Sequence, residues 1–152
     1  DASHGLHVNG NGHGGIVITL GSAPIYTRSW KLKMITRSSS ESELVTLEEA
    51  STFPAWITQL MADLYMLENN RLPIIYQDNK STMLLAVNGG SFARTKHLMI
   101  KKSFVRQGVE QKQFRICYLP TEQMLADWMT KSMSGSDHVR SMKHLHMCVI
   151  KW

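Results

Sequence analysis

The stretch Pro73-Ile74-Ile75-Tyr76-Gln77-Asp78-Asn79-Lys80-Ser81 decides the fold class of this sequence. A short apolar run bounded by turn residues is typical of a strand that is buried on both faces. Asp78 comes directly after this run, so we expect it at the carboxyl end of a strand, where ligands bind in open α/β sheets. The alternative is that Asp78 only caps the helix that begins after it.

The composition indicates one globular domain over residues 1–152, because 43% of the residues are hydrophobic and 19% are charged. Seventeen Lys and Arg against twelve Asp and Glu give a formal net charge of +5. That charge favours a polyanionic partner, although a basic surface without a specific partner has the same composition. The two cysteines indicate neither a disulfide framework nor a zinc site, and they favour a reducing compartment. No run is long and apolar enough to span a membrane.

The pattern of the remaining chain predicts an α/β fold. Strands are expected at residues 16–20, 25–32, 74–76 and 114–119, because these runs are apolar, β-branched or alternate in polarity. Asp1-Ala2-Ser3 begins abruptly, and we expect it to be the end of a truncated first strand in a fragment of a longer protein. The first three strands are expected to be antiparallel, and the fourth is expected to run parallel to the first. Apolar residues at helical spacing predict a long helix before residue 67, interrupted at Pro54, and helices after residues 79, 94, 121 and 135.

Glu43 is a candidate site residue because it lies on the apolar stripe of the first predicted helix, where an unpaired carboxylate is costly. Serine precedes glutamate by three residues twice, as Ser38 to Glu41 and Ser40 to Glu43, and this spacing is a capping box. The alternative for Glu43 is therefore that it only reaches back to Ser40. Asp127 is ambiguous in the same way, since it lies beside the apolar stripe of a late helix and could simply be exposed.

Two other groups of polar residues carry candidate chemistry. His4, His7 and His13 could bind a metal, but they fall in a glycine-rich loop, and exposed loop histidines are the simpler interpretation. A basic run without acidic residues opens the helix after residue 94 and suits phosphate contacts, unless it is only a solvated face. The members of this run are Arg94, Lys96, His97, Lys101, Lys102 and Arg106.

Asp1, Glu43, Asp78 and Asp127 all stand at the ends of predicted elements. Carboxylate oxygens are ligands for hard cations such as Mg²⁺, and crowded carboxylates repel one another unless cations neutralise them. If the four converge, a pair of metal ions of the kind found in phosphoryl-transfer sites would explain their arrangement.

The sequence closely resembles the ribonuclease H domain at the end of the Pol polyprotein of copia-type LTR retrotransposons. The resemblance covers nearly the whole chain. It rests on Asp1-Ala2-Ser3, Trp30-Lys31-Leu32-Lys33, Ser38-Ser39-Ser40-Glu41-Ser42-Glu43, Tyr76-Gln77-Asp78-Asn79-Lys80-Ser81, Arg94-Thr95-Lys96-His97, Tyr118-Leu119-Pro120-Thr121-Glu122 and Leu125-Ala126-Asp127.

This resemblance implies a ribonuclease H-like fold with a five-stranded mixed sheet flanked by helices. It implies that Asp1, Glu43, Asp78 and Asp127 bind two Mg²⁺ ions, with Mn²⁺ as a substitute, and that the enzyme is an endonuclease that cuts the RNA strand of RNA–DNA hybrids during reverse transcription. The expected hybrid contacts are Ser3, Asn79, Arg94, Lys96, His97, Lys101, Lys102 and Arg106. The upstream reverse transcriptase domain would be a partner, in a cytoplasmic virus-like particle.

The sequence departs from the family in one place that bears on activity. Many ribonucleases H carry a histidine in the loop before the last catalytic helix, whereas Pro120-Thr121-Glu122 is short and has none. Product release is therefore expected to be slower or to involve Glu122. The alternative to an active enzyme is a decayed, inactive retroelement fragment that keeps the fold and binds nucleic acid weakly.

Overall fold

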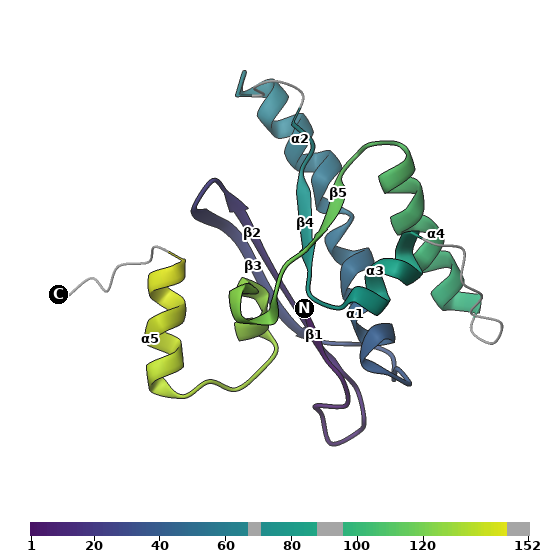
Figure 1. The fold of residues 1–152 in the computed structure, drawn as a ribbon, viewed down its shortest axis with the longest axis vertical. Coiled ribbons are helices and arrows are strands. Elements are labelled where there is room, and N and C mark those ends of the chain that lie inside the picture. The colour runs from purple at the N-terminus through teal and green to yellow at the C-terminus, as the bar shows by residue number, and fades with distance from the viewer. Residues whose placement is uncertain (67–70, 88–95, 146–152) are drawn as a thin grey trace.

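The computed structural model describes residues 1–66, 71–87 and 96–145, which fold around two separate sheets (Figure 1). The first sheet has the order β1-β2-β3 and is antiparallel throughout. Its strands are β1 (Ala2–Ser3), β2 (His13–Leu20) and β3 (Ala23–Lys31). Gly21 has a φ of +60° in the tight β2–β3 turn, a backbone conformation that glycine adopts without strain. The predicted antiparallel pairing of the first three strands is confirmed.

The predicted long helix is two helices, α1 (Ser39–Ala50) and α2 (Phe53–Asp63). Ser38 caps α1, since its side chain accepts a hydrogen bond from the Glu41 backbone N–H. Pro54 lies in the first turn of α2, where a missing N–H leaves no hydrogen bond unmade. The serine half of the predicted capping box therefore forms at Ser38, while the Glu41 carboxylate accepts the Arg37 backbone N–H at 2.7 Å. The prediction of an interruption at Pro54 is confirmed.

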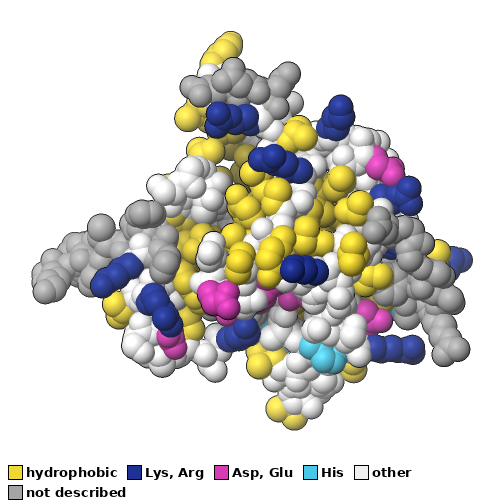
Figure 2. Space-filling model, viewed as in Figure 1, with side chains coloured by type: hydrophobic (Ala, Val, Ile, Leu, Met, Phe, Trp, Pro, Cys, Tyr) yellow, Lys and Arg dark blue, Asp and Glu magenta, His cyan; other side chains and the backbone are white. Residues whose placement is uncertain are grey.

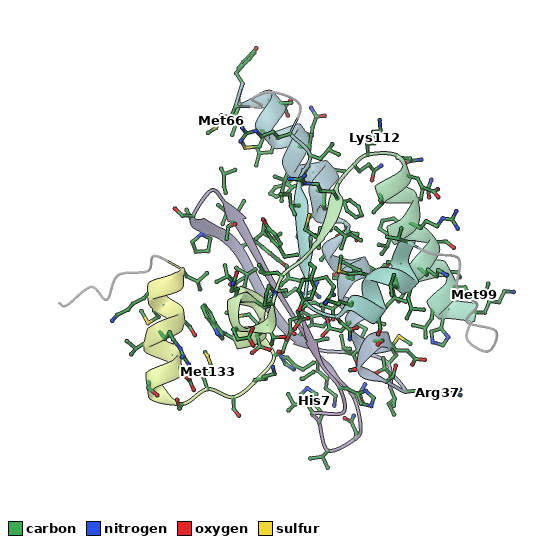
Figure 3. The ribbon with its side chains drawn as sticks, in the orientation of Figure 1. His7, Arg37, Met66, Met99, Lys112 and Met133 are labelled. Carbon is green, nitrogen blue, oxygen red and sulfur yellow. The ribbon has the colours of Figure 1, made fainter. Side chains whose placement is uncertain are left out.

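The second sheet contains β4 (Ile74–Gln77) and β5 (Arg115–Tyr118), which pair in parallel. The crossover between them contains α3 (Lys80–Val87) and α4 (Lys96–Glu110). A core of four buried residues joins these helices and β5 to α1, and its members are Leu47, Ala86, Val105 and Phe114. Lys112, labelled in Figure 3, has a φ of 55° in the turn from α4 into β5.

The expected late helix is a pair of short 3₁₀ helices, η1 (Thr121–Gln123) and η2 (Leu125–Met129). η2 packs against β2, so it carries Asp127 to the side of the first sheet. The final helix, α5 (Gly135–His144), begins at the Ser134 cap and packs against η2, at the edge of the molecule in Figure 1.

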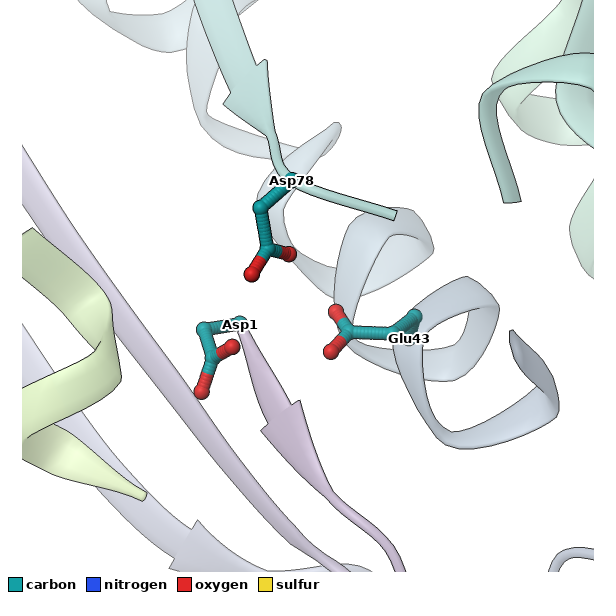
Figure 4. A group of neighbouring side chains, drawn as sticks. All are labelled: Asp1, Glu43 and Asp78. Atoms are coloured by element: carbon teal, nitrogen blue, oxygen red, sulfur yellow. The ribbon is translucent and has the colours of Figure 1, made fainter. Parts of the chain in front are cut away.

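The prediction of one five-stranded sheet is wrong, because the described residues form a three-stranded and a two-stranded sheet. β1 has only two residues, and both pair with β2, so β1 does not bridge the first sheet to β4. The arrows of β1 and β4 nevertheless point the same way in Figure 4, as expected for the first and fourth strands. Arg94 lies outside the described residues. Within the described ranges, no helix has the length and apolar character needed to cross a membrane.

Candidate metal centre

Three of the four predicted carboxylates meet at one point between the two sheets (Figure 4). Asp1 directly precedes β1, Glu43 lies in the second turn of α1, and Asp78 directly follows β4. Each residue offers one carboxylate oxygen, and these oxygens all lie within 4.8 Å of one another. Among the described residues, this is the group of three or more His, Cys, Asp and Glu side chains that could hold a metal ion.

Glu43 is the buried member of the group, with 4% of its surface exposed. Its Oε1 accepts a hydrogen bond from the Ala2 backbone N–H at 2.9 Å, and its Oε2 accepts one from Gln77 Nε2 at 3.3 Å. Burial raises the pKa of Glu43, while the nearby N-terminal ammonium and the Ala2 N–H act against that rise. The two hydrogen bonds direct Glu43 across the fold, so the interpretation of Glu43 as a cap for Ser40 is wrong.

Asp78 is likewise free of the capping role that its position allowed. The side chain of Asn79 accepts the Thr82 backbone N–H at 3.0 Å, so Asn79 rather than Asp78 caps the start of α3. Asp78 Oδ2 instead accepts a hydrogen bond from the Thr121 hydroxyl at 2.7 Å. This contact ties the end of β4 to η1 and leaves the Asp78 carboxylate facing Asp1 and Glu43 (Figure 4).

Asp1 is positioned by β2 and by η2. Its carbonyl accepts the Gly15 N–H at 2.9 Å, and its α-amino group donates to the Gly15 carbonyl at 3.2 Å. Its carboxylate accepts a hydrogen bond from the Thr130 hydroxyl, which follows η2. Burial lowers the pKa of the α-amino group, whereas the charges of Glu43, Asp78 and Asp127 act to raise it.

Asp127, the fourth predicted carboxylate, is near this group but not a member of it. Its carboxylate forms an ion pair with Lys131, four residues later and beyond the end of η2. Its charge acts to raise the pKa of the α-amino group of Asp1. The structure therefore brings Asp1, Glu43 and Asp78 together and leaves Asp127 neutralised by a lysine.

Two residues predicted to contact nucleic acid, Ser3 and Asn79, lie near the centre and form hydrogen bonds within the protein. The Ser3 hydroxyl donates to the Thr130 carbonyl at 3.0 Å, and Asn79 caps α3. Both lie beside metal-centre residues, because Ser3 belongs to β1 and Asn79 follows Asp78.

The basic residues of α4, the predicted basic helix, differ in their exposure and in their ion pairs. Lys101 forms an ion pair with Glu48 of α1, and Arg106 forms one with Glu110 of α4 itself. Lys102 is only 8% exposed. Lys96 and His97 are exposed at the start of the helix, and Met99 points outward from it (Figure 3). The exposed members of the predicted set on α4 are thus Lys96, His97 and Arg106, of which Arg106 is already paired with Glu110.

The loop histidines do not form one site. His7 and His13 lie 3.0 Å apart between ring nitrogens, whereas His4 contacts the Thr36 hydroxyl at 3.1 Å. Figure 3 places His7 in the loop between β1 and β2. Sequence reasoning missed the role of Thr130, which contacts Asp1, because an isolated threonine after a helix has no distinguishing signal.

The donor set of the centre consists of carboxylate oxygens, which suits Mg²⁺ or another hard divalent cation. Without a cation, three carboxylates at this separation repel one another, and burial adds to the cost at Glu43. The residues present therefore fit a divalent metal ion.

Comparisons with known proteins identify homologues of the chain. It is 34% identical over 120 residues to the retrovirus-related Pol polyprotein from transposon RE1 of Arabidopsis thaliana, a match that covers 79% of the chain and 8% of that polyprotein. The corresponding polyprotein from transposon RE2 of the same plant is 32% identical over 120 residues, and that from transposon TNT 1-94 of Nicotiana tabacum is 24% identical over 117 residues.

The homologues of this chain are thus retrovirus-related Pol polyproteins from plant transposons. The chain spans less than a tenth of the length of these relatives. No family model matches the sequence, and no solved structure matches it at a significant level.

Proposed function

We propose that this chain is the ribonuclease H unit of a retrotransposon Pol polyprotein, a metal-dependent endonuclease that hydrolyses the RNA strand of RNA–DNA hybrids. The observation that carries the proposal is the convergence of Asp1, Glu43 and Asp78 from three separate elements. The homologous Pol polyproteins support the retrotransposon context, and the net charge of +5 suits a polyanionic substrate.

In this proposal, Asp1, Glu43 and Asp78 would hold the cations, and Asp127 would contribute a further carboxylate if it were released from its ion pair with Lys131. Bound divalent cations would supply an activated water and stabilise the charge on the phosphate during in-line displacement. Thr130 and Thr121 orient the carboxylates of Asp1 and Asp78 through their hydroxyl groups.

A positive side chain stands next to this centre and suits the phosphate backbone of a substrate. The Lys80 ammonium lies 4.7 Å from the centre of the Tyr118 ring, so the aromatic face holds it at the start of α3, two residues after Asp78. Lys80 therefore adds a phosphate contact to the set predicted from the sequence.

The first test is cleavage of a labelled RNA–DNA hybrid with Mg²⁺, set against double-stranded RNA and double-stranded DNA. Asp78→Asn should abolish cleavage and leave hybrid binding largely intact, because asparagine keeps the shape of the side chain but weakens metal coordination. Asp63→Asn is the matched control, since Asp63 is an exposed carboxylate of α2 that contacts Gln59.

The proposal would be supported if the wild-type chain and the Asp63→Asn variant cleave the hybrid and the Asp78→Asn variant does not. Binding of the hybrid without cleavage by the wild-type chain would instead support the decayed-fragment alternative. Undiminished cleavage by the Asp78 variant would remove Asp78 from the set of metal ligands.

A further inference from the structure

Two histidines outside the carboxylate centre form a hydrogen-bonded pair that the proposed function does not use. The Nε2 of His7, in the loop between β1 and β2, lies 3.0 Å from the Nδ1 of His13, the first residue of β2. In Figure 2, histidine is visible at the surface in the region of this loop, and Figure 3 labels His7 there. Both side chains are half-buried, so an ion from solvent can reach the two facing nitrogens.

The loop that carries His7 is held in a defined conformation. The His7 N–H donates to the Asn11 carbonyl at 3.1 Å, and the His7 carbonyl accepts the Gly10 N–H at 2.7 Å. Gly10 has a φ of +80°, a conformation that glycine adopts without strain. The side chain of the buried Asn11 then donates to the Leu32 carbonyl at 2.6 Å. These contacts supply the fixed spacing that the glycine-rich sequence did not indicate for these histidines.

The hydrogen bonds of Ser29 determine which nitrogen of His13 carries the proton. The Ser29 hydroxyl donates to the Met129 carbonyl at 2.6 Å, so its oxygen accepts the hydrogen bond of 2.7 Å from His13 Nε2. His13 Nδ1 is therefore left with a lone pair directed at His7. Burial, and then the charge of His7, lower the pKa of His13 and favour the neutral ring. An outer hydrogen bond of this kind is what fixes the ligating nitrogen of a histidine in metal sites.

The separation of the two facing nitrogens suits a chelated transition-metal ion. Imidazole binds Zn²⁺, Cu²⁺ and Ni²⁺, and Zn–N bonds are about 2.0–2.1 Å long. With bonds of that length, nitrogens 3.0 Å apart subtend an angle of about 95° at the metal. A separation only about 0.3 Å larger gives the tetrahedral angle that zinc prefers. Mg²⁺ prefers oxygen ligands, so this pair selects a different class of metal from the carboxylates.

We propose that His7 and His13 form a two-histidine site for a divalent transition-metal ion, separate from the carboxylate centre. His7 Nε2 and His13 Nδ1 each donate a lone pair to the ion, and water completes its coordination. His13 keeps its proton on Nε2, bonded to Ser29. The proton that His7 Nε2 donates in the metal-free pair moves to His7 Nδ1 through solvent, so the neutral rings release no net proton. This proposal is independent of the proposed enzymatic function.

The first test is titration calorimetry with Zn²⁺ in excess Mg²⁺, which competes for the carboxylates. The wild-type chain should show saturable binding of a single equivalent. Ser29→Ala should weaken binding about tenfold, because it removes the outer hydrogen bond to His13. His7→Gln and His13→Gln each remove a ligand and should weaken binding by more than Ser29→Ala does. His138→Gln is the control and should bind as the wild type does, since His138 is an exposed histidine of α5.

NMR of the ring nitrogens in the wild-type chain supplies a readout that needs no substitution. Zn²⁺ should shift the resonances of His13 Nδ1 and His7 Nε2 and leave the His13 Nε2 proton in place. Equal weakening by His138→Gln, or Zn²⁺ binding that leaves these two nitrogens unshifted, would overturn the proposal and assign the zinc to other contacts. The absence of saturable Zn²⁺ binding would overturn it as well, and would leave the pair as a hydrogen bond between two histidines.

Discussion

Glu43 shows most directly how single residues prepare the candidate metal centre. Its carboxylate is buried at 4% exposure, and its two hydrogen bonds, from Ala2 and Gln77, hold it in place. Burial raises its pKa above the ordinary value of 4.5. The folded protein therefore binds a proton at Glu43 more tightly than the unfolded chain does, and a bound cation must compete with that proton.

Glu43→Gln should stabilise the metal-free protein relative to wild type, increasingly so at higher pH. The raised pKa contributes stability that is fully present below the unfolded pKa and is lost as the pH rises through the folded pKa. Glutamine has no such loss. The measurement is Tm in chelator from pH 4 to 8, with Asp63→Asn expected to follow the wild-type curve. Identical curves for wild type and Glu43→Gln would show that Glu43 ionises as freely in the fold as in the unfolded chain.

At the scale of the secondary-structure elements, the short 3₁₀ helix η2 supports one side of the centre. It packs against β2 with very little space, since a Cβ on Gly15 would lie 2.7 Å from the Met129 Cβ and 2.8 Å from the Ala126 carbonyl oxygen. The Thr130 hydroxyl directly after η2 then reaches the Asp1 carboxylate. The position of η2 therefore affects how Asp1 and Asp127 lie relative to Glu43 and Asp78.

Gly15→Ala should displace η2 and cost about 1–3 kcal/mol of unfolding free energy, because the added methyl group overpacks the β2–η2 contact. It should also weaken the Mg²⁺-dependent rise in Tm, because Thr130 would move away from Asp1. Gly135→Ala is the control, since a Cβ there meets nothing within 4 Å. Wild-type stability and an unchanged Mg²⁺ response in Gly15→Ala would show that η2 does not position the centre.

On the scale of the whole molecule, the net charge of +5 suits polyanion binding, but the positive charges are not equally available. On α4, Lys101 and Arg106 already neutralise Glu48 and Glu110, whereas Lys96 is exposed at the start of the helix. The number of lysines in the predicted basic run therefore overstates the number of phosphate contacts that α4 can make.

Lys96→Gln should lower the salt slope of hybrid binding by about 1, as expected for the loss of one phosphate contact. Lys101→Gln should leave the slope unchanged and lower the unfolding free energy by less than about 1 kcal/mol, because it removes a partly exposed ion pair with Glu48. The measurement is the affinity for the hybrid, determined by fluorescence anisotropy at salt concentrations from about 50 to about 300 mM, where the loss of a phosphate contact changes the slope. A larger decrease in the salt slope for Lys101→Gln than for Lys96→Gln would show that Lys101, and not Lys96, makes the phosphate contact.

The sequence by itself determined the local features of this protein. The Ser38 cap and the interruption at Pro54 follow from backbone hydrogen bonding within a few residues, and both are confirmed. The strand that places Asp78 at its carboxyl end is also local, because a short apolar run followed by polar residues specifies it. These features depend on neighbouring residues alone, so sequence patterns are sufficient to predict them.

Only the tertiary structure decided which partners those residues have. The Glu43 side chain could bond back to Ser40 or to a residue distant in sequence. It bonds to the Ala2 N–H, because a buried carboxylate needs a hydrogen-bond donor. Asp127 matched the predicted site pattern, yet its carboxylate forms an ion pair with Lys131, four residues later. Likewise, β1 and β4 run in the same direction but lie in separate sheets, since β1 pairs with β2 and β4 pairs with β5. Such outcomes depend on contacts between residues far apart in the chain, for which a local sequence pattern carries no signal.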